Sequence, residues 1–79
     1  MDIIKEILAD LTRTSDPVAC LRDKVVADGG VWSDPERLPG IVEIQLAGLV
    51  GIGPSVAAAV DDWIVQARAR ALNPPQILL

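Results

Sequence analysis

The sequence contains no histidine and a single cysteine, Cys20, and these two scarcities narrow the chemistry open to the protein. Without histidine, the chain has neither a serine–histidine nor a cysteine–histidine pair to activate a nucleophile. A zinc site of histidine and cysteine is excluded for the same reason, and one cysteine cannot form a disulfide within the chain. We therefore expect a non-enzymatic protein with no metal and no cofactor, in a reducing, cytoplasmic compartment, with Cys20 as an ordinary buried thiol.

Aromatic and basic residues are also scarce. The chain has no phenylalanine and no tyrosine, so its core must be aliphatic, with Trp32 and Trp63 as the only large rings. Seven lysine and arginine residues face eleven aspartate and glutamate residues, which gives a net charge of −4. Proteins that bind nucleic acid by neutralising phosphates usually present a basic face. The excess of acidic residues instead indicates a basic protein partner. The alternative is that the charge only keeps the protein soluble. The 79 residues predict one domain, 1–79.

Charged residues are missing from Ile44–Val60, which raises the question of a membrane span. The run is short for a bilayer, and Gly51, Gly53 and Pro54 interrupt it. Acidic residues also stand near the N-terminus, where a signal peptide has basic ones. We expect a buried core segment, with no membrane contact.

Three stripes of apolar residues with helical spacing predict amphipathic helices. The first covers about Asp2–Thr12. The second begins at Pro17, after a cap by Ser15 or Asp16, and ends at Gly29. The third places Pro54 in its first turn and runs to about Leu72.

The middle of the chain predicts two further helical elements. The spacing of Ser33 and Glu36 is that of a capping box, which indicates a single helical turn over Asp34–Leu38. The apolar segment Ile41–Leu49 has Glu43 as its only charge, so we expect the most buried helix there. Because this segment is rich in β-branched residues, a buried strand is the competing interpretation. The fold expected is an all-α bundle of four main helices with one short helical turn.

The stretch Leu46–Val60 centres on the glycines Gly51 and Gly53, and glycine readily adopts the positive φ angles of tight turns. Its pattern Leu-x-Gly-Ile-Gly-Pro-x-x-Ala-x-x-Val resembles the helix-hairpin-helix motif, a DNA-backbone-binding element. The resemblance implies a tight corner between two helices and phosphate contacts from N–H groups at the start of the second helix. The residues concerned are Gly51, Gly53, Ser55 and Val56.

The chain departs from that motif next to the turn. The family often has lysine or arginine directly after the proline, whereas this chain has Ser55, followed by Asp61 and Asp62. The alternatives are a purely structural corner between two core helices, or a site for another anion. The two aspartates are also candidates for a divalent cation, but adjacent helical residues point about 100° apart and no third ligand is suitably spaced. We expect a solvated acidic face there.

Two functions from different classes follow from these features. The first is a small acidic module that binds a basic surface of another protein, as an inhibitor or adaptor. Phage- or mobile-element-encoded inhibitors that mimic nucleic acid by charge are a class-level analogy. The second is sequence-independent binding to the DNA backbone through the helix-hairpin-helix turn. The partner-binding residues expected are Glu43, Asp61, Asp62 and the tail residues Ile77, Leu78 and Leu79. The apolar tail, 73–79, either packs on its own core or docks on another chain.

Overall fold

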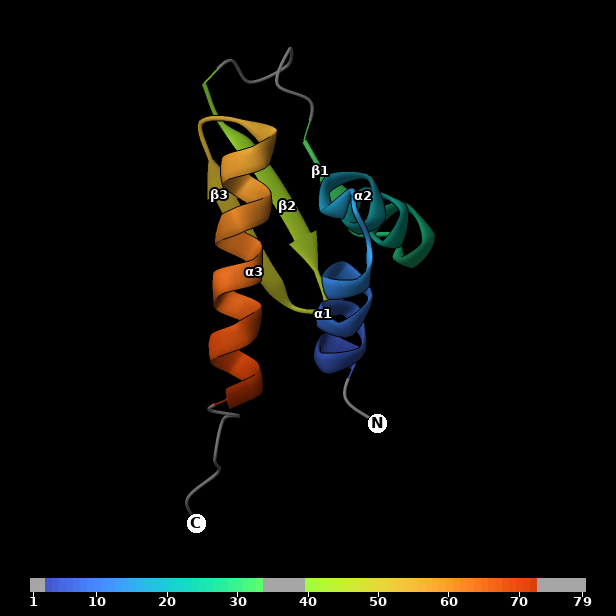
Figure 1. Cartoon of the computed structure of the whole chain (residues 1–79). Coiled ribbons are helices and arrows are strands. Elements are labelled where there is room, and N and C mark those ends of the chain that lie inside the picture. Colours follow the sequence, from blue (N-terminus) through green and yellow to red (C-terminus); the bar gives the residue numbers. More distant parts are fainter. Residues whose placement is uncertain (1–2, 34–39, 73–79) are drawn as a thin grey trace.

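A computed structural model gives the structure of the chain and describes residues 3–33 and 40–72. Two helices come first, then three strands, then a third helix (Figure 1). Their bounds are α1 (Ile3–Arg13), α2 (Pro17–Asp28), β1 (Val31–Trp32), β2 (Val42–Leu46), β3 (Leu49–Gly53) and α3 (Val56–Leu72). The protein is therefore an α+β fold, and the predicted all-α bundle of four main helices is wrong.

The three strands form one antiparallel sheet in the order β1-β2-β3. A two-residue turn joins β2 to β3, with φ of 54° at Ala47 and 78° at Gly48. Positive φ at both central residues is the mark of a type I′ turn, whose twist matches that of the strands it connects. The chain reverses here, at Ala47 and Gly48, and not at Gly51 and Gly53 as predicted.

The segment predicted as the most buried helix, Ile41–Leu49, is thus the strand β2 with the turn that follows it, in line with the competing interpretation of a strand. Apolar Val42, Ile44 and Leu46 are buried and alternate with the half-buried Glu43 and Gln45. This period of two places one side of β2 against the core, which a helix over the same residues would not do. The helix-hairpin-helix-like corner is wrong for the same reason, because its first helix is a strand.

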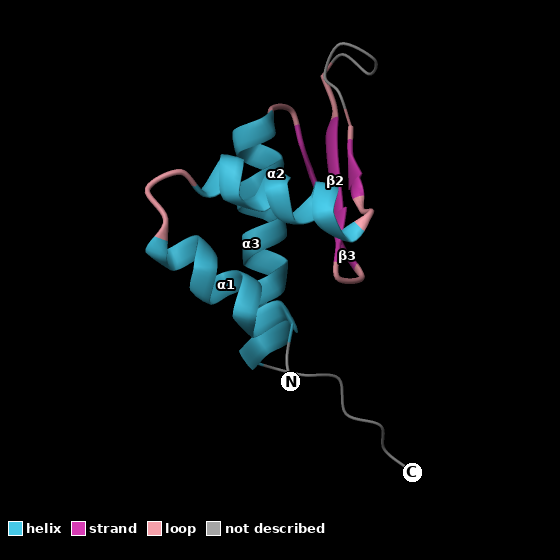
Figure 2. Ribbon diagram, turned by 90° about the vertical axis from the view of Figure 1, so that its right-hand side faces the viewer, coloured by secondary structure: helices cyan, strands magenta, loops and turns pink. Residues whose placement is uncertain are grey.

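Helices α2 and α3 contact the sheet, and the strands lie at the side of the molecule (Figure 2). Helix α3 packs on β3 and also contacts β2, and α1 and α2 each contact α3. Trp63 of α3 is fully buried, and its indole N–H donates to the carbonyl oxygen of Leu46 at 3.2 Å. The buried core consists of Ile4, Ile7, Leu11, Leu21, Val25, Val42, Ile44, Leu46, Leu49, Ala59, Val60, Trp63 and Ala67.

The three helices predicted from apolar stripes are confirmed. At the start of α2, Asp16 accepts a hydrogen bond from the Ala19 N–H at 3.1 Å, and Pro17 is the first helical residue. Gly29 ends α2 in the left-handed conformation, with φ of 71°. In α3 the predicted stripe faces the core, with Val60, Trp63 and Ala67 buried. The predicted turn over Asp34–Leu38 and the tail 73–79 lie outside the described residues.

Candidate functional site

The face of the sheet turned away from α3, here called the outer face, carries exposed aliphatic side chains. Their exposed fractions are 41% for Val31, 53% for Ile41, 37% for Val50 and 51% for Ile52. The register sets Val31 and Val50 on either side of Gln45, and Ile52 opposite Glu43. Ile41 directly precedes β2 and continues the same alternation. Residues from β1, β2 and β3 thus build one surface that none of the described helices covers.

Glu43 places a negative charge among these aliphatic residues. Gln45 Nε2 donates to Glu43 Oε2 at 2.9 Å, and the Glu43 N–H donates to Ser33 Oγ at 2.6 Å. Glu43 is half-buried, and no ion pair within residues 3–33 and 40–72 includes it. The outer face therefore combines apolar area with one carboxylate whose charge has no cation opposite it.

The adjacent residues Asp61 and Asp62, predicted as one acidic patch, have different environments. Asp61 is exposed, whereas Asp62 is half-buried beside the free edge of β3. Asp62 Oδ2 accepts from the Ile52 N–H at 2.9 Å and from Gln66 Nε2 at 3.0 Å. Gln66 Nε2 also donates to the Val50 carbonyl oxygen at 2.5 Å. Asp62 and Gln66 together are called the edge clamp below.

The edge clamp satisfies backbone groups that β3 has no strand to pair with. Sheet edges present unpaired N–H and C=O groups that invite association with other chains, and proteins commonly cover them. Here Asp62 covers an N–H and Gln66 covers a carbonyl, so α3 is fixed along the edge as well as over the face of β3. Asp62 is thus engaged within the fold, and Asp61 is the one of the pair whose side chain faces solvent.

The glycines of the predicted phosphate site serve close packing between β3 and α3. A Cβ at Gly51 would lie 2.5 Å from the Ala59 carbonyl oxygen and 2.7 Å from Trp63 Cβ. A Cβ at Gly53 would lie 2.7 Å from Ala58 Cβ and from the Ala59 N–H nitrogen. Both glycines also pair with β2 in the ladder, and neither has a positive φ. Their backbones are held in the sheet beneath α3.

Ser55 and Val56 lie at the start of α3, as the sequence predicts. Ser55 precedes the helix, and its Oγ accepts from the Ala58 N–H at 3.1 Å. This is the usual arrangement of an N-cap. The Ser55 hydroxyl therefore accepts from one of the N–H groups that a phosphate would otherwise bind. The nearby Ile52 N–H donates to Asp62.

An ion-pair cluster joins α1 to α2 on another side of the molecule. Lys24 Nζ lies 2.6 Å from Asp10 Oδ2, and Arg13 pairs with the other carboxylate oxygen of Asp10. Hydrogen bonds from Lys24 and then Arg13 hold the pKa of Asp10 below its ordinary value. The same contact with Asp10 raises the pKa of Lys24. The cluster thus joins two cations to one carboxylate and connects the two helices.

The part of the chain that the structure describes was predicted to hold no metal site, and it shows no candidate group for one. It contains no group of three or more cysteine, aspartate and glutamate side chains able to hold a metal ion. Cys20 is a free, half-buried thiol packed against the core. None of the helices over these residues combines the length and apolar character needed to cross a membrane. The tail residues Ile77, Leu78 and Leu79 lie outside the described residues.

Comparisons of this chain with protein-family models, with curated proteins and with solved structures each give no match. The site must therefore be judged from its own geometry. The sequence predicts Glu43 as a partner-binding residue, which stays a prediction. It does not single out the other residues of the outer face and its edge, which are Val31, Ile41, Gln45, Val50, Ile52 and Gln66. The alternation of apolar and polar residues over Val42–Leu46 was the signal for an outer face.

Proposed function

We propose that the chain is a small acidic protein-binding module without catalytic activity, which docks through its outer face on a basic surface of a partner protein. The observation that carries this proposal is the uncovered sheet face, with four exposed aliphatic residues around Glu43. Contiguous exposed apolar surface is typical of interaction sites. A cytoplasmic location is part of the proposal, supported by the free thiol of Cys20.

The character of the partner follows from burying this face. Removing the aliphatic side chains from water stabilises a complex by about 25 cal/mol for each Å² of apolar area. Burying Glu43 without a cation opposite it would weaken the complex, because the unpaired carboxylate would lose its hydration. A partner that presents a lysine or arginine opposite Glu43, within an apolar surround, avoids this cost. The net charge of −4 also favours encounter with a basic surface.

The proposal is tested by affinity capture from the native host with matched surface variants. Ile52→Lys places a charge on the outer face, whereas Val65→Lys places the same charge on α3 at a residue 63% exposed. We expect a partner retained by wild type and by Val65→Lys and lost with Ile52→Lys. Circular dichroism of all three proteins checks that they fold. Equal capture by all three would show that the outer face is not the interface.

A second experiment tests the charge requirement with the partner so obtained. Glu43→Gln keeps the side-chain shape but removes the charge, so we expect weaker binding and a smaller loss of affinity with added salt. Asp61→Asn, on the exposed side of α3, is the matched control. If Asp61→Asn weakened binding more than Glu43→Gln, the interface would lie on α3 and not on the sheet.

Binding to the DNA backbone is the alternative function. It would rest on N–H groups at the start of α3, next to the carboxylate of Asp62. A phosphate there would meet a negative charge, and no base lies on α3 before Arg68. For these reasons we favour the protein-binding function.

A further inference from the structure

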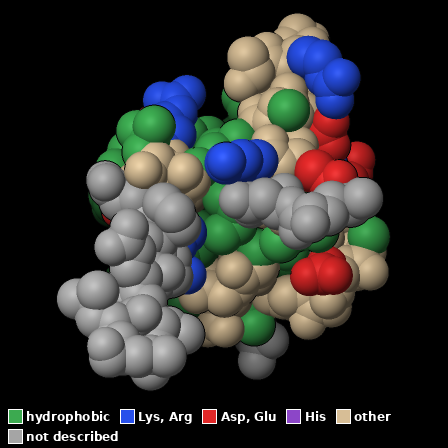
Figure 3. Space-filling view, turned by 90° about the horizontal axis from the view of Figure 1, so that it is seen from below, with side chains coloured by type: hydrophobic (Ala, Val, Ile, Leu, Met, Phe, Trp, Pro, Cys, Tyr) green, Lys and Arg blue, Asp and Glu red, His purple; other side chains and the backbone are tan. Residues whose placement is uncertain are grey.

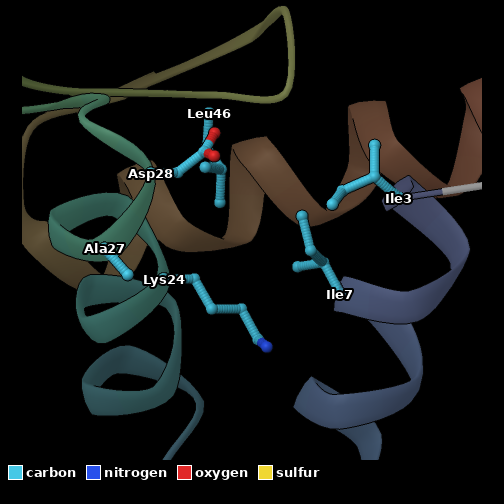
Figure 4. Close-up of a pocket in the computed structure, with 6 residues that line it drawn as sticks. All are labelled: Ile3, Ile7, Lys24, Ala27, Asp28 and Leu46. Atoms are coloured by element: carbon cyan, nitrogen blue, oxygen red, sulfur yellow. The ribbon is translucent and has the colours of Figure 1, made fainter.

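A pocket of about 220 Å³ opens between α1, α2 and the end of β2 (Figure 4). It is lined by Ile3, Ile7, Lys24, Ala27, Asp28 and Leu46. Seen from below, hydrophobic, basic and acidic side chains all reach this face of the molecule, and the aspartate and glutamate side chains gather on one side (Figure 3). The residues that line the pocket are thus aliphatic apart from Lys24 and Asp28.

The two charged residues of this pocket are not equivalent. Lys24 lines it with its methylene stem, and its Nζ is turned away from Asp28 (Figure 4) and lies 2.6 Å from Asp10. Asp28 is exposed at the last position of α2 and has no ion pair with any of the described residues. The C-terminal end of a helix adds partial negative charge. Asp28 is therefore the charged residue of the lining that has no ion pair within residues 3–33 and 40–72.

The pocket continues toward the outer face. A second hollow, of about 340 Å³, shares Asp28 and Leu46 with the pocket and extends along the β-hairpin to Gln45 and Val50. Gln45 and Val50 belong to the outer face, where they are cross-strand partners. A chain bound to the outer face can therefore place a side chain into the pocket without leaving the surface.

We propose that this pocket takes a lysine or arginine side chain of the basic partner, with the methylenes between Ile3, Ile7 and Leu46 and the cation at Asp28. Long basic side chains bury their stems against apolar surface and keep the charged head at the rim. A ligand carboxylate would have to compete with Asp10 for Lys24, which is the cation among the lining residues. This inference rests on the proposed function, since it names the anchor residue of the same partner.

The test needs no partner. ¹⁵N-labelled protein is titrated with n-butylguanidinium, with n-butanol and with butyrate, which share the alkyl chain and differ in charge. We expect saturable amide shifts confined to the pocket residues, tightest with n-butylguanidinium and weakest with butyrate. Asp28→Asn should weaken n-butylguanidinium roughly two- to fivefold, as expected for an exposed ion pair. Asp23→Asn, an exposed aspartate of α2 outside the pocket, should leave the affinity unchanged.

A pocket-filling pair of variants gives an independent readout. Ala27→Leu fills the pocket and should abolish the shifts, whereas Ala19→Leu adds the same group to an exposed position of α2 outside the pocket. Butyrate or butanol binding as tightly as n-butylguanidinium would overturn the proposal. Amide shifts scattered over the surface would also overturn it. So would the absence of shifts when n-butylguanidinium is added up to its solubility limit. Those results leave the capture experiment on the outer face unaffected, so the two failures are distinguishable.

Discussion

At the scale of single residues, Asp10 stands out because it receives cations from two helices. Lys24 reaches it from α2, and Arg13 pairs with it from one turn along α1. A carboxyl group whose pKa is lowered on folding stabilises the fold above its ordinary pKa, and this contribution is lost as the pH falls through the lowered value. Lys24 has the opposite pH dependence. Its pKa is raised on folding, so its contribution to stability is present below its ordinary pKa and is lost as the pH rises through the raised value.

The pKa of Asp10 is a direct test of this cluster. In Lys24→Gln we expect the pKa of Asp10 to rise toward its ordinary value, and to rise less in Arg13→Gln, because the hydrogen bond from Lys24 has the larger effect. Side-chain carboxyl shifts followed by NMR from about pH 2 to pH 6 measure this. An unchanged pKa in Lys24→Gln would show that the helices are not joined through Asp10.

The neighbours Asp61 and Asp62 allow a matched comparison at the same scale. Asp62→Ala leaves the Ile52 N–H without its acceptor, so we expect a loss of about 1–2 kcal/mol in the free energy of unfolding. Asp61→Ala removes an exposed carboxylate and should change it by less than about 0.5 kcal/mol. Urea denaturation gives both values, and hydrogen exchange of the Ile52 amide should accelerate only in Asp62→Ala. Equal effects would contradict the edge clamp.

At the scale of elements, the contact between β3 and α3 depends on the absence of side chains. Gly51 and Gly53 lie on the inner face of β3, where alternate residues face the helix. Their lack of Cβ atoms lets the backbones approach closely, and the edge clamp then fixes the helix along the strand. Trp63 fills the space beside them and anchors to β2 through the Leu46 carbonyl oxygen.

This packing predicts a large penalty for one methyl group. Gly51→Ala forces α3 away from β3, because the new Cβ would lie within 2.8 Å of three atoms of the helix. We expect a loss of about 1–3 kcal/mol in the free energy of unfolding, measured by urea denaturation. Val50→Ile also adds one carbon to β3, on the exposed outer face, and should be close to neutral. Equal stability of Gly51→Ala and wild type would rule out the close contact.

At the scale of the whole molecule, helices α2 and α3 contact a three-stranded sheet (Figure 2). None of the described helices covers the outer face of the sheet, which carries aliphatic residues around one carboxylate. The pocket beside α2 extends this surface around the β-hairpin. Apolar area and negative charge therefore lie together, which is the combination expected for a basic protein partner.

The same arrangement predicts weak binding to DNA. With a net charge of −4, the chain gains little from counterion release, and the Asp62 carboxylate lies near the N–H groups at the start of α3 that would approach a phosphate. In fluorescence titrations at about 0.15 M salt we expect no complex with duplex DNA at micromolar protein. Micromolar binding that Ser55→Asp abolishes would contradict this and support contact at the start of α3.

The sequence by itself determined the three helices. Their signals are local: the stripe of α1, the Asp16 cap and left-handed Gly29 of α2, and the Val60–Trp63–Ala67 face of α3. Each depends on residues within a few turns of one another, so no distant contact is needed to identify it. The acidic character and the absence of histidine chemistry are likewise properties of the sequence alone.

Only the tertiary structure decided the state of Ile41–Gly53. A short apolar run with β-branched residues fits a buried helix or a buried strand, and the choice depends on what it packs against. The same holds for the spaced glycines Gly51 and Gly53, which fit a tight turn as well as a strand beneath a helix. The sequence predicts Asp62 as a solvated acidic residue, whereas in the fold it belongs to the edge clamp. Each assignment needs the position of α3 over β3, because burial and hydrogen-bond partners are set by neighbours that local sequence does not specify.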